Sequence, residues 1–238
     1  MSELRTIVII PTYNEIENVE AISRAVMLLN PKFDILFIDD NSPDGTAEKV
    51  KSLMSEFNGR IFLEQRTGKL GLGTAYIHGF KWSITNNYDY VFEMDCDFSH
   101  DPNDLIRLFD SCRDGADLVI GSRYCKGGKV KNWPLDRILM SYFASIYVRL
   151  ILCIGIKDTT AGFKCFRTEV LKKINLDNVL FKGYAFQICM KYAAIRHGFK
   201  VKEIPITFID RIHGESKMST GIFKEAFFGV WKMRKMNL

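Results

Sequence analysis

The feature of this sequence that most constrains its fold is the alternation of short apolar runs with amphipathic segments over the first 120 residues. Strand-like runs rich in β-branched residues span 6–10, 34–38, 60–64, 90–94 and 116–120. Segments with helical periodicity lie between them, at 17–29, 46–57, 73–85 and 102–111. Asp101 is the predicted N-cap of the last one, because Pro102 suits a first helical turn. Strand alternating with helix predicts a layered α/β fold around a parallel sheet.

After Gly121 the strands and helices no longer alternate regularly, but no linker separates this part from the first. A basic loop is followed by an apolar segment at 140–156, a short strand at 162–167, a helix at 185–197 and a strand at 201–209. No Pro- or Ser-rich linker divides the chain. We therefore expect one domain over residues 1–238, in which 1–121 and 122–221 form two halves of one site and 222–238 form a C-terminal amphipathic helix.

Charge and cysteine content narrow the partners and the compartment. The 33 Lys and Arg residues exceed the 28 Asp and Glu residues, giving a net charge of +5. This excess suits anionic ligands or a membrane surface but is small for a nucleic-acid binder, so we expect no nucleic acid partner. The six cysteines form no C-x-x-C pair, which predicts reduced thiols in a cytosolic protein. The N-terminal apolar run stops at Pro11, too early for a signal peptide.

Two apolar segments bear on membrane contact. Residues 140–156 contain Arg149 and Gly155, which favours a buried helix or a helix on a lipid surface over a membrane span. The C-terminal segment mixes aromatic and basic side chains, namely Phe223, Phe227, Phe228 and Trp231 with Lys224, Lys232, Arg234 and Lys235. Such a helix fits either packing on the domain or attachment to anionic headgroups, and both interpretations stay open.

Acidic and polar residues follow the predicted strands of the first half. Ligands of open parallel sheets bind at the carboxyl ends of the strands, where this chain has 11–15 (PTYNE), 39–45 (DDNSPDG) and 95–97 (DCD). Carboxylates brought together repel one another unless a cation or hydrogen-bond donor offsets them. Asp95 and Asp97, two residues apart, could direct both carboxylates toward one Mg²⁺ or Mn²⁺ that shares its oxygen ligands with a substrate diphosphate. Taken alone, the D-x-D spacing also fits an ordinary turn.

These motifs, taken with others along the chain, resemble those of a known enzyme family. The further motifs are 121–124 (GSRY), 127–128 (GG), 132–134 (NWP) with Arg137, 158–163 (DTTAGF), Asp210-Arg211 and 214–217 (GESK). Together they resemble the inverting GT-A glycosyltransferases, and more narrowly the dolichol-phosphate (polyprenol-phosphate) mannose synthases, over essentially the whole chain. The resemblance implies a GT-A, Rossmann-like layered fold with a mostly parallel central sheet, in which 1–121 bind the nucleotide sugar and 122–221 form the acceptor side.

The resemblance also implies roles for individual residues. The nucleotide-sugar site would comprise Pro11, Tyr13, Glu15, Ile38, Asp40, Asp95, Cys96, Asp97, Arg123, Arg211 and Lys217. The metal ligands would be Asp95 and Asp97, with Ser99 where the family commonly has glutamine. The catalytic set would be Asp97, Arg123, Arg137 and Arg211, with Arg137 on the lipid phosphate.

We make separate predictions for three further residues and for one glycine-containing stretch. His100 is expected to be a solvated loop residue rather than a ligand. Ala161 and Lys164 depart from the family's Ser and Arg, and we expect them to tune the acceptor side. The stretch 68–73 matches neither G-x-G-x-x-G nor the P-loop, which predicts a turn into the next helix beside the donor.

The implied reaction is transfer of mannose from GDP-mannose to a polyprenyl (dolichyl-type) monophosphate with inversion, using Mg²⁺ or Mn²⁺. Its products are polyprenyl β-mannosyl phosphate and GDP. The acceptor phosphate is already anionic, so a general base is not required. A surface helix or a separate membrane-anchoring subunit would hold the chain peripherally on the cytoplasmic face of a membrane. The alternatives are the same transfer from UDP-glucose or another sugar nucleotide, and a catalytically silent nucleotide-sugar-binding or membrane-scaffold protein.

Overall fold

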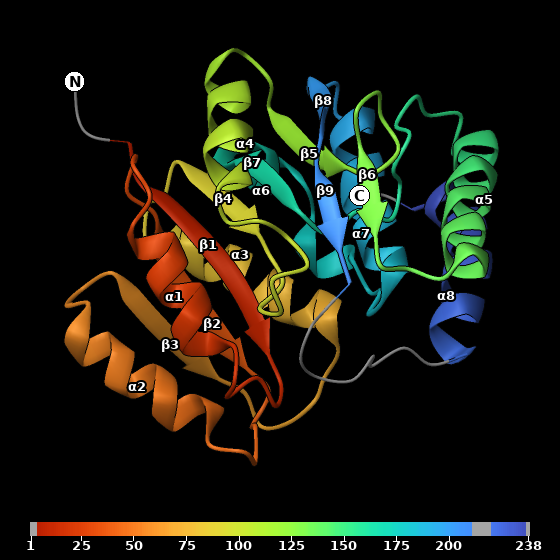
Figure 1. Ribbon diagram of the computed structural model, residues 1–238. Coiled ribbons are helices and arrows are strands. Elements are labelled where there is room, and N and C mark those ends of the chain that lie inside the picture. The colour runs from red at the N-terminus through yellow and green to blue at the C-terminus, as the bar shows by residue number, and fades with distance from the viewer. Residues whose placement is uncertain (1–3, 211–219, 237–238) are drawn as a thin grey trace.

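A computed structural model describes residues 4–210 and 220–236 and shows a layered α/β fold (Figure 1). The main sheet has seven strands in the spatial order β3-β2-β1-β4-β7-β5-β8. Their bounds are β1 Thr6–Thr12, β2 Asp34–Asp39, β3 Ile61–Gln65, β4 Tyr90–Glu93, β5 Leu118–Ser122, β7 Lys164–Arg167 and β8 Val201–Pro205. β7 runs antiparallel to β4 and β5, and the other pairings of this sheet are parallel. The predicted mostly parallel sheet is therefore confirmed.

Helices cover both faces of the sheet, and β1 shows why. Its residues Ile7, Val8, Ile9 and Ile10 are all fully buried, as in a parallel strand covered on both sides. Successive side chains point to opposite faces, so Ile7 and Ile9 join one apolar cluster, and Val8 and Ile10 join the other. The first cluster includes residues of α3 (Leu72–Thr85), α6 (Thr168–Lys173), the 3₁₀ turn Leu176–Asn178 and α7 (Tyr184–Arg196). The second includes residues of α1 (Val19–Met27), α2 (Thr46–Glu56) and α4 (Asp104–Arg113).

A small second sheet pairs β6 (Lys129–Lys131) in parallel with β9 (Thr207–Ile209). The sequence predicts one continuous strand at 201–209, and this prediction is wrong. Pro205 ends β8 because it has no N–H with which to continue the ladder. Ile206 then turns the chain, donating its N–H to Ser122 and accepting the Lys129 N–H, and β9 leaves the main sheet.

Two further helices, α5 (Leu135–Leu152) and α8 (Thr220–Met233), lie beside each other at the right of Figure 1. α5 begins before the predicted apolar segment and ends at Leu152, and Cys153 after it has a left-handed backbone (φ 55°). α8 ends at Met233 rather than at 238. Within the described residues, no helix is both long and apolar enough to span a bilayer.

Each of α5 and α8 has one buried face and one exposed apolar face. On α5, Val148 is buried, whereas Leu150 is 74% exposed. On α8, Val230 is fully buried, whereas Phe228 is 68% exposed. The buried face of α5 agrees with the interpretation of 140–156 as a helix packed on the domain. Contact of the exposed face with a lipid surface stays a prediction.

The start of α4 differs from the prediction. Its first residue is Asp104, and Asp101 is not the N-cap. The carboxylate of Asp101 instead accepts the N–H of Asn103 at 2.9 Å, within the turn that precedes the helix. Asp101 therefore fixes this turn, and the helix begins later than Pro102 suggested.

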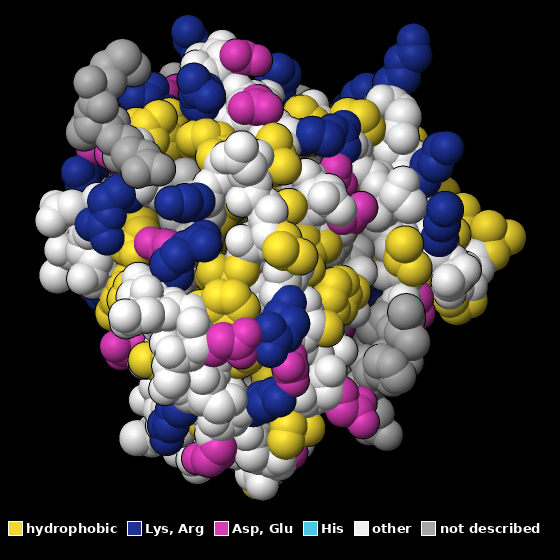
Figure 2. Space-filling model, turned by 60° about the vertical axis from the view of Figure 1, so that its left-hand side comes forward, with side chains coloured by type: hydrophobic (Ala, Val, Ile, Leu, Met, Phe, Trp, Pro, Cys, Tyr) yellow, Lys and Arg dark blue, Asp and Glu magenta, His cyan; other side chains and the backbone are white. Residues whose placement is uncertain are grey.

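The cysteines and the surface charges can be compared with the expectations from composition. All six cysteines lie in the described part of the chain and none of them forms a disulfide. On the face shown in Figure 2, Lys and Arg side chains are interspersed with Asp and Glu and with apolar side chains. The net positive charge is therefore not gathered into one patch on that face.

Candidate active site

The predicted nucleotide pocket lies where β2, β1 and β4 end side by side. The parallel register of β1 and β2 pairs Pro11 with Ile38 and Thr12 with Asp39. Asp40 follows at the end of β2, and its N–H bonds to the carbonyl of Thr12. Three of the predicted residues, Pro11, Ile38 and Asp40, are therefore neighbours because of sheet register.

The two carboxylates at the end of β2, Asp39 and Asp40, accept hydrogen bonds from donors of the protein. Asp39 is fully buried and accepts the N–H of Ser42 at 2.9 Å and its hydroxyl at 2.6 Å. Asp40 accepts Arg66 Nε at 2.6 Å and the Leu70 N–H at 3.2 Å. Burial raises the pKa of Asp40, although Arg66 opposes this. Hydrogen-bond donors of the protein therefore offset the carboxylates at this strand end, and Arg66, which follows β3, was not among the predicted residues.

Tyr13 and Glu15 follow β1 and contact neighbouring segments. Lys69 Nζ lies 4.8 Å from the centre of the Tyr13 ring, so the loop between β3 and α3 lies beside the residues that follow β1. The loop leads directly into α3, as predicted, but α3 begins at Leu72, so only 68–71 of the predicted 68–73 lie in the connection. The N–H of Glu15 bonds to Thr46 Oγ1, and its carboxylate accepts Asn18 Nδ2 at 2.9 Å. Lys69 is therefore an additional basic residue beside the predicted Tyr13, placed there by the loop.

Asp95, Cys96 and Asp97 directly follow β4 with Met94. The side chain of Asp95 is 39% exposed, whereas Asp97 is 8% exposed and accepts the Ser99 N–H at 3.1 Å. Ser99 Oγ is buried without a hydrogen-bond partner among the described residues. Two carboxylates and a hydroxyl are hard oxygen donors that fit Mg²⁺ or Mn²⁺. In the described part of the chain, no three His, Cys, Asp or Glu residues gather as a metal site.

His100 is buried, contrary to the prediction of a solvated residue. It is 3% exposed, stacks on Phe163 at 4.8 Å between ring centres, and meets the ring of Phe208 at 5.4 Å. Its Nδ1 accepts the N–H of Asp95 at 3.3 Å. Burial lowers the pKa of His100, which favours the neutral ring that this hydrogen bond requires. The sequence did not reveal this role because both aromatic partners come from distant segments.

Arg123 forms a buried ion pair with Asp158, a residue that the motif 158–163 contained but to which no role was assigned. Arg123 Nε and Nη2 each donate to a carboxylate oxygen at 2.7 Å. The two side chains are 8% and 0% exposed. Burial opposes ionisation of Asp158, but Arg123 outweighs it and lowers the pKa. Arg123 also donates to Thr160 at 2.8 Å, so its guanidinium is held at several points.

Arg137 is more accessible and lies in the first turn of α5. Its Nη1 bonds to both carboxylate oxygens of Asp210, at 3.1 and 3.2 Å, and its side chain is 25% exposed. Its guanidinium carbon lies 3.9 Å from the centre of the Trp133 ring. Arg211 and Lys217, the other two predicted basic residues, lie outside the residues that the structure describes.

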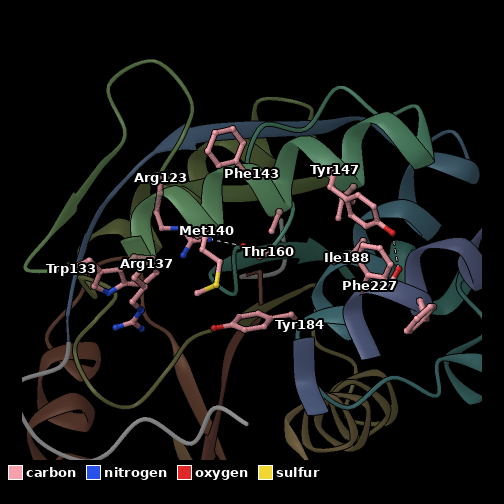
Figure 3. A pocket seen from close by; sticks show the side chains of 14 residues that line it. Arg123, Trp133, Arg137, Met140, Phe143, Tyr147, Thr160, Tyr184, Ile188 and Phe227 are labelled. Atoms are coloured by element: carbon pink, nitrogen blue, oxygen red, sulfur yellow. Dashed lines mark hydrogen bonds between the residues drawn. The ribbon is translucent and has the colours of Figure 1, made fainter. Parts of the chain in front are cut away.

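Two adjoining cavities meet at these arginines. The larger, about 530 Å³, is mostly apolar and runs along α5 to the aromatic residues of α8. The smaller, about 110 Å³, includes Asp95 and Ser99. Both cavities share five lining residues, which are Arg123, Trp133, Arg137, Thr160 and Tyr184. Figure 3 shows Trp133 and Arg137 at one end of the larger cavity and Tyr147 and Phe227 at the other.

A buried polar network lies beneath the smaller cavity. Glu93 and Lys164 are fully buried and form an ion pair at 3.0 Å, and Gln187 Nε2 donates to Glu93 at 2.9 Å. Burial raises the pKa of Glu93 and lowers that of Lys164, while the ion pair opposes both shifts. Lys164 is thus part of the interior, and the expectation that it tunes the acceptor side is not supported by any contact in the described structure.

Lys191 completes this interior network and was also missed. Its buried Nζ donates to the carbonyls of Thr159 at 2.9 Å and Ala161 at 2.7 Å, which fixes the loop that lines both cavities. Gln187 and Lys191 lie four residues apart and therefore share one face of α7. This spacing fits a solvent-exposed face as well as a buried network, so the sequence did not identify Lys191.

Comparison with known proteins agrees with this geometry. Residues 7–175 match the family described as Glycosyl transferase family 2. A polyprenol monophosphomannose synthase of Mycolicibacterium smegmatis is 48% identical, over 97% of this chain and 88% of that protein. An undecaprenyl-phosphate mannosyltransferase of Micrococcus luteus is 44% identical, over 95% of this chain and 93% of that protein. Both names confirm the resemblance that the motifs predicted.

Solved structures share the fold at much lower identity. Glucosyl-3-phosphoglycerate synthase of Mycobacterium tuberculosis, in complex with Mn²⁺, UDP and its product, has a TM-score of 0.67 at 17% identity, covering 97% of this chain and 78% of that one. The same enzyme with Mn²⁺, UDP-glucose and phosphoglyceric acid has a TM-score of 0.70 at 16% identity, covering 98% and 81%. The fold is therefore that of GT-A glycosyltransferases. Since the family match and both curated relatives extend over most of its length, the chain belongs to glycosyl transferase family 2.

Proposed function

We propose that this chain transfers mannose from GDP-mannose to a polyprenyl monophosphate, with inversion at the anomeric carbon and release of GDP. The observation that carries the proposal is the larger cavity, which is about 530 Å³ and mostly apolar. Arg123 and Arg137 border it where it adjoins the smaller cavity, which contains Asp95 and Ser99 and is called the acidic corner below together with Asp97. An acceptor with an apolar tail and an anionic head fits this arrangement, because each end of it meets a matching environment. The names of the two curated relatives support transfer of mannose to a polyprenyl phosphate.

The donor would lie across the ends of β1, β2 and β4. Pro11, Tyr13, Glu15, Ile38 and Asp40 would surround the nucleotide, since register and loops bring them to one edge of the sheet. The carboxylate of Asp40 can accept ring N–H groups of the base in addition to its bonds from Arg66 and Leu70, because each oxygen has two lone pairs. Lys217 and Arg211 are proposed to contact the donor and the substrate phosphates.

The diphosphate would lie at Asp95, Cys96 and Asp97. A divalent cation held there by Asp95 and Asp97, with Ser99 Oγ as a further ligand, supplies positive charge against the departing diphosphate. The bound Mn²⁺ of the structurally similar synthase supports such a cation in this fold. The buried Ser99 Oγ, unpartnered among the described residues, supports a ligand at this corner.

The acceptor phosphate would lie at the boundary between the cavities. Arg137 is well suited to hold it, because guanidinium groups bind phosphate oxygens through paired N–H donors, and the N-terminal end of α5 adds a favourable dipole. A phosphate oxygen forms the new bond to the anomeric carbon as the bond to the GDP oxygen breaks. Attack from the side opposite GDP inverts this carbon and gives the β-mannosyl phosphate.

We also propose that the outward apolar faces of α5 and α8 rest on the cytoplasmic surface of a membrane. Leu139, Phe143 and Leu150 are exposed at helical spacing on α5, and Phe228 and Trp231 are exposed on α8. The same two helices line the larger cavity, so a lipid could reach the arginines without leaving the bilayer entirely. A separate membrane-anchoring subunit would act on the same side of the molecule.

The deciding experiment combines several donors and acceptors and identifies products by mass spectrometry. We expect a mannosyl product from GDP-mannose and polyprenyl phosphate, loss of product with EDTA, and recovery with Mg²⁺ or Mn²⁺. Product from UDP-glucose alone would contradict the mannose assignment. Absence of product from every donor would favour a silent binding protein.

A matched pair of variants tests the acidic corner. Asp97→Ala should lower turnover by about a hundredfold or more, because the charge that holds the cation is lost. Asp110→Ala removes an exposed aspartate of α4 and serves as the control, with turnover expected to remain unchanged. Equal activity of the two variants would contradict the metal role of Asp97.

A further inference from the structure

Trp133 contacts both arginines at the boundary between the cavities. The guanidinium carbon of Arg137 lies 3.9 Å from the centre of the indole ring, and that of Arg123 lies 5.4 Å away. A tryptophan face attracts cations more strongly than any other aromatic side chain. The ring therefore offsets part of the repulsion between two positive charges that line the same space.

The small sheet determines where this ring lies. Trp133 follows β6, and its ring meets the edge of Phe208, in β9, at 5.2 Å. Asp210, which pairs with Arg137, follows β9 and donates its N–H to the carbonyl of Lys131 in β6. The pairing of β6 with β9 thus places both contacts of Arg137.

The contacts of Arg137 with Asp210 and with Trp133 differ in whether they occupy the N–H donors that a ligand would use. Asp210 engages Nη1 through both carboxylate oxygens, so a phosphate that takes this nitrogen has to displace Asp210 from it. The aromatic face of Trp133 holds the cation without using a hydrogen-bond donor. The ring contact can consequently persist whichever N–H donors of Arg137 bind the anion, whereas the ion pair persists only if the anion leaves Nη1 to Asp210.

We propose that Trp133 is a positioning residue that holds Arg137 through its aromatic face while Arg137 binds the phosphate head of the prenyl acceptor. The proposal rests on the function proposed above, because it takes Arg137 as the group that receives the acceptor phosphate. Trp133 acts on the acceptor through Arg137 and forms no bond in the reaction.

The test measures binding of farnesyl phosphate by calorimetry, without donor, to the wild-type protein and to two variants. Trp133→Leu should raise the Kd for farnesyl phosphate about five- to thirtyfold, the range expected for a partly buried cation–aromatic contact. Trp133→Phe should stay within about threefold of wild type, because a ring face remains. The Kd for GDP-mannose should not change in either variant. The KM for farnesyl phosphate should follow its Kd.

A second tryptophan provides the matched control. Trp82 packs on Phe62 at 5.0 Å and lines neither cavity. Trp82→Leu should lower the melting temperature and leave the Kd for farnesyl phosphate unchanged. An increase in this Kd equal to that of Trp133→Leu would show a general structural effect and overturn the proposal.

Two further outcomes would also overturn it. If Trp133→Phe binds as weakly as Trp133→Leu, the indole N–H, which has no partner among the described residues, matters rather than the ring face. If Trp133→Leu raises the Kd further in an Arg137→Gln background, the ring contacts the lipid directly. A wild-type protein that binds farnesyl phosphate but forms no mannosyl product refutes the proposed function alone, since the binding comparison still decides the role of Trp133.

Discussion

Arg123 and Arg137 border the same cavities but differ in how firmly each is held. Arg123 is 8% exposed and makes a two-point ion pair with fully buried Asp158. Arg137 is 25% exposed, and its two bonds to Asp210, both from Nη1, are longer, at 3.1 and 3.2 Å. Removing one partner of a buried pair leaves an uncompensated charge, whereas a more exposed pair is screened by water. Arg123 therefore serves as a fixed charge, and Arg137 is the one suited to exchange partners.

The first prediction follows from this burial. Asp158→Ala should lower the free energy of unfolding by about 3–5 kcal/mol, because Arg123 would stay buried without its partner. Glu169→Gln removes one side of the exposed pair with Lys172 and should cost less than about 1 kcal/mol. Urea unfolding of both variants measures the difference. Similar losses in the two variants would show that burial of Arg123 does not control the cost.

At the scale of elements, the connection from β5 to β6 positions the arginine side of the site. It carries Arg123 at its start and continues past Gly127 and Gly128 into the small sheet. The N–H of Gly128 bonds to the carbonyl of Cys125, which closes a tight turn. The chain passes so near itself here that only a residue without a side chain fits at 128.

The second prediction tests this close approach. A Cβ added at Gly128 would lie 2.5 Å from the carbonyl oxygen of Arg123 and 2.6 Å from that of Ser122. Since these are backbone atoms that cannot rotate away, Gly128→Ala should destabilise the protein by about 1–3 kcal/mol. Gly155→Ala is the control, because nothing lies within 4 Å of its added Cβ, and it should stay within about 0.5 kcal/mol of wild type. Thermal unfolding compares them, and equal melting temperatures would contradict the steric argument.

At the scale of the whole molecule, α5 and α8 give it one side with an apolar surface. Their exposed side chains include Leu135, Leu139, Met140, Tyr142, Phe143, Leu150, Phe227, Phe228 and Trp231. Exposed apolar patches of this kind mark interaction surfaces. The larger cavity lies along the same helices, so docking there would bring the site to the lipid.

The third prediction concerns this surface. The double variant Leu139→Glu with Leu150→Glu should bind vesicles of phosphatidylglycerol and phosphatidylethanolamine at least about tenfold more weakly, because two apolar contacts become charged. Neither residue lines the larger cavity. Leu28→Glu is the control, since Leu28 is 85% exposed at the end of α1, away from both helices. Sedimentation with vesicles measures binding, and equal binding of control and double variant would place the contact elsewhere.

The sequence predicted those parts of the fold that depend on local pattern. Strands β1 to β5 appear as apolar runs, and their carboxyl ends meet because parallel connections require it. The small sheet was not predicted, because β6 has only three residues and two of them are lysines. Its pairing with β9 is a contact between distant segments, which no local pattern encodes.

The site was predictable in its residue types but less so in its partners. The motifs indicated Asp95, Asp97 and Arg137, whereas Arg66 and the burial of His100 emerged only from the folded chain. Such partners come from neighbouring strands and loops whose spacing in sequence carries no fixed period. A buried charge therefore signals that a partner exists without identifying it.

The position of β7 has a consequence for the evolution and engineering of this protein. This strand belongs to the second half of the chain but lies between β4 and β5 of the first half, and it pairs antiparallel with both of them. A hybrid joined at residue 121 from two homologous parents would have to match a foreign β7 to both inherited neighbours. Crossover points placed in the surface loops after β7 should therefore yield many more folded hybrids than those placed at the apparent midpoint.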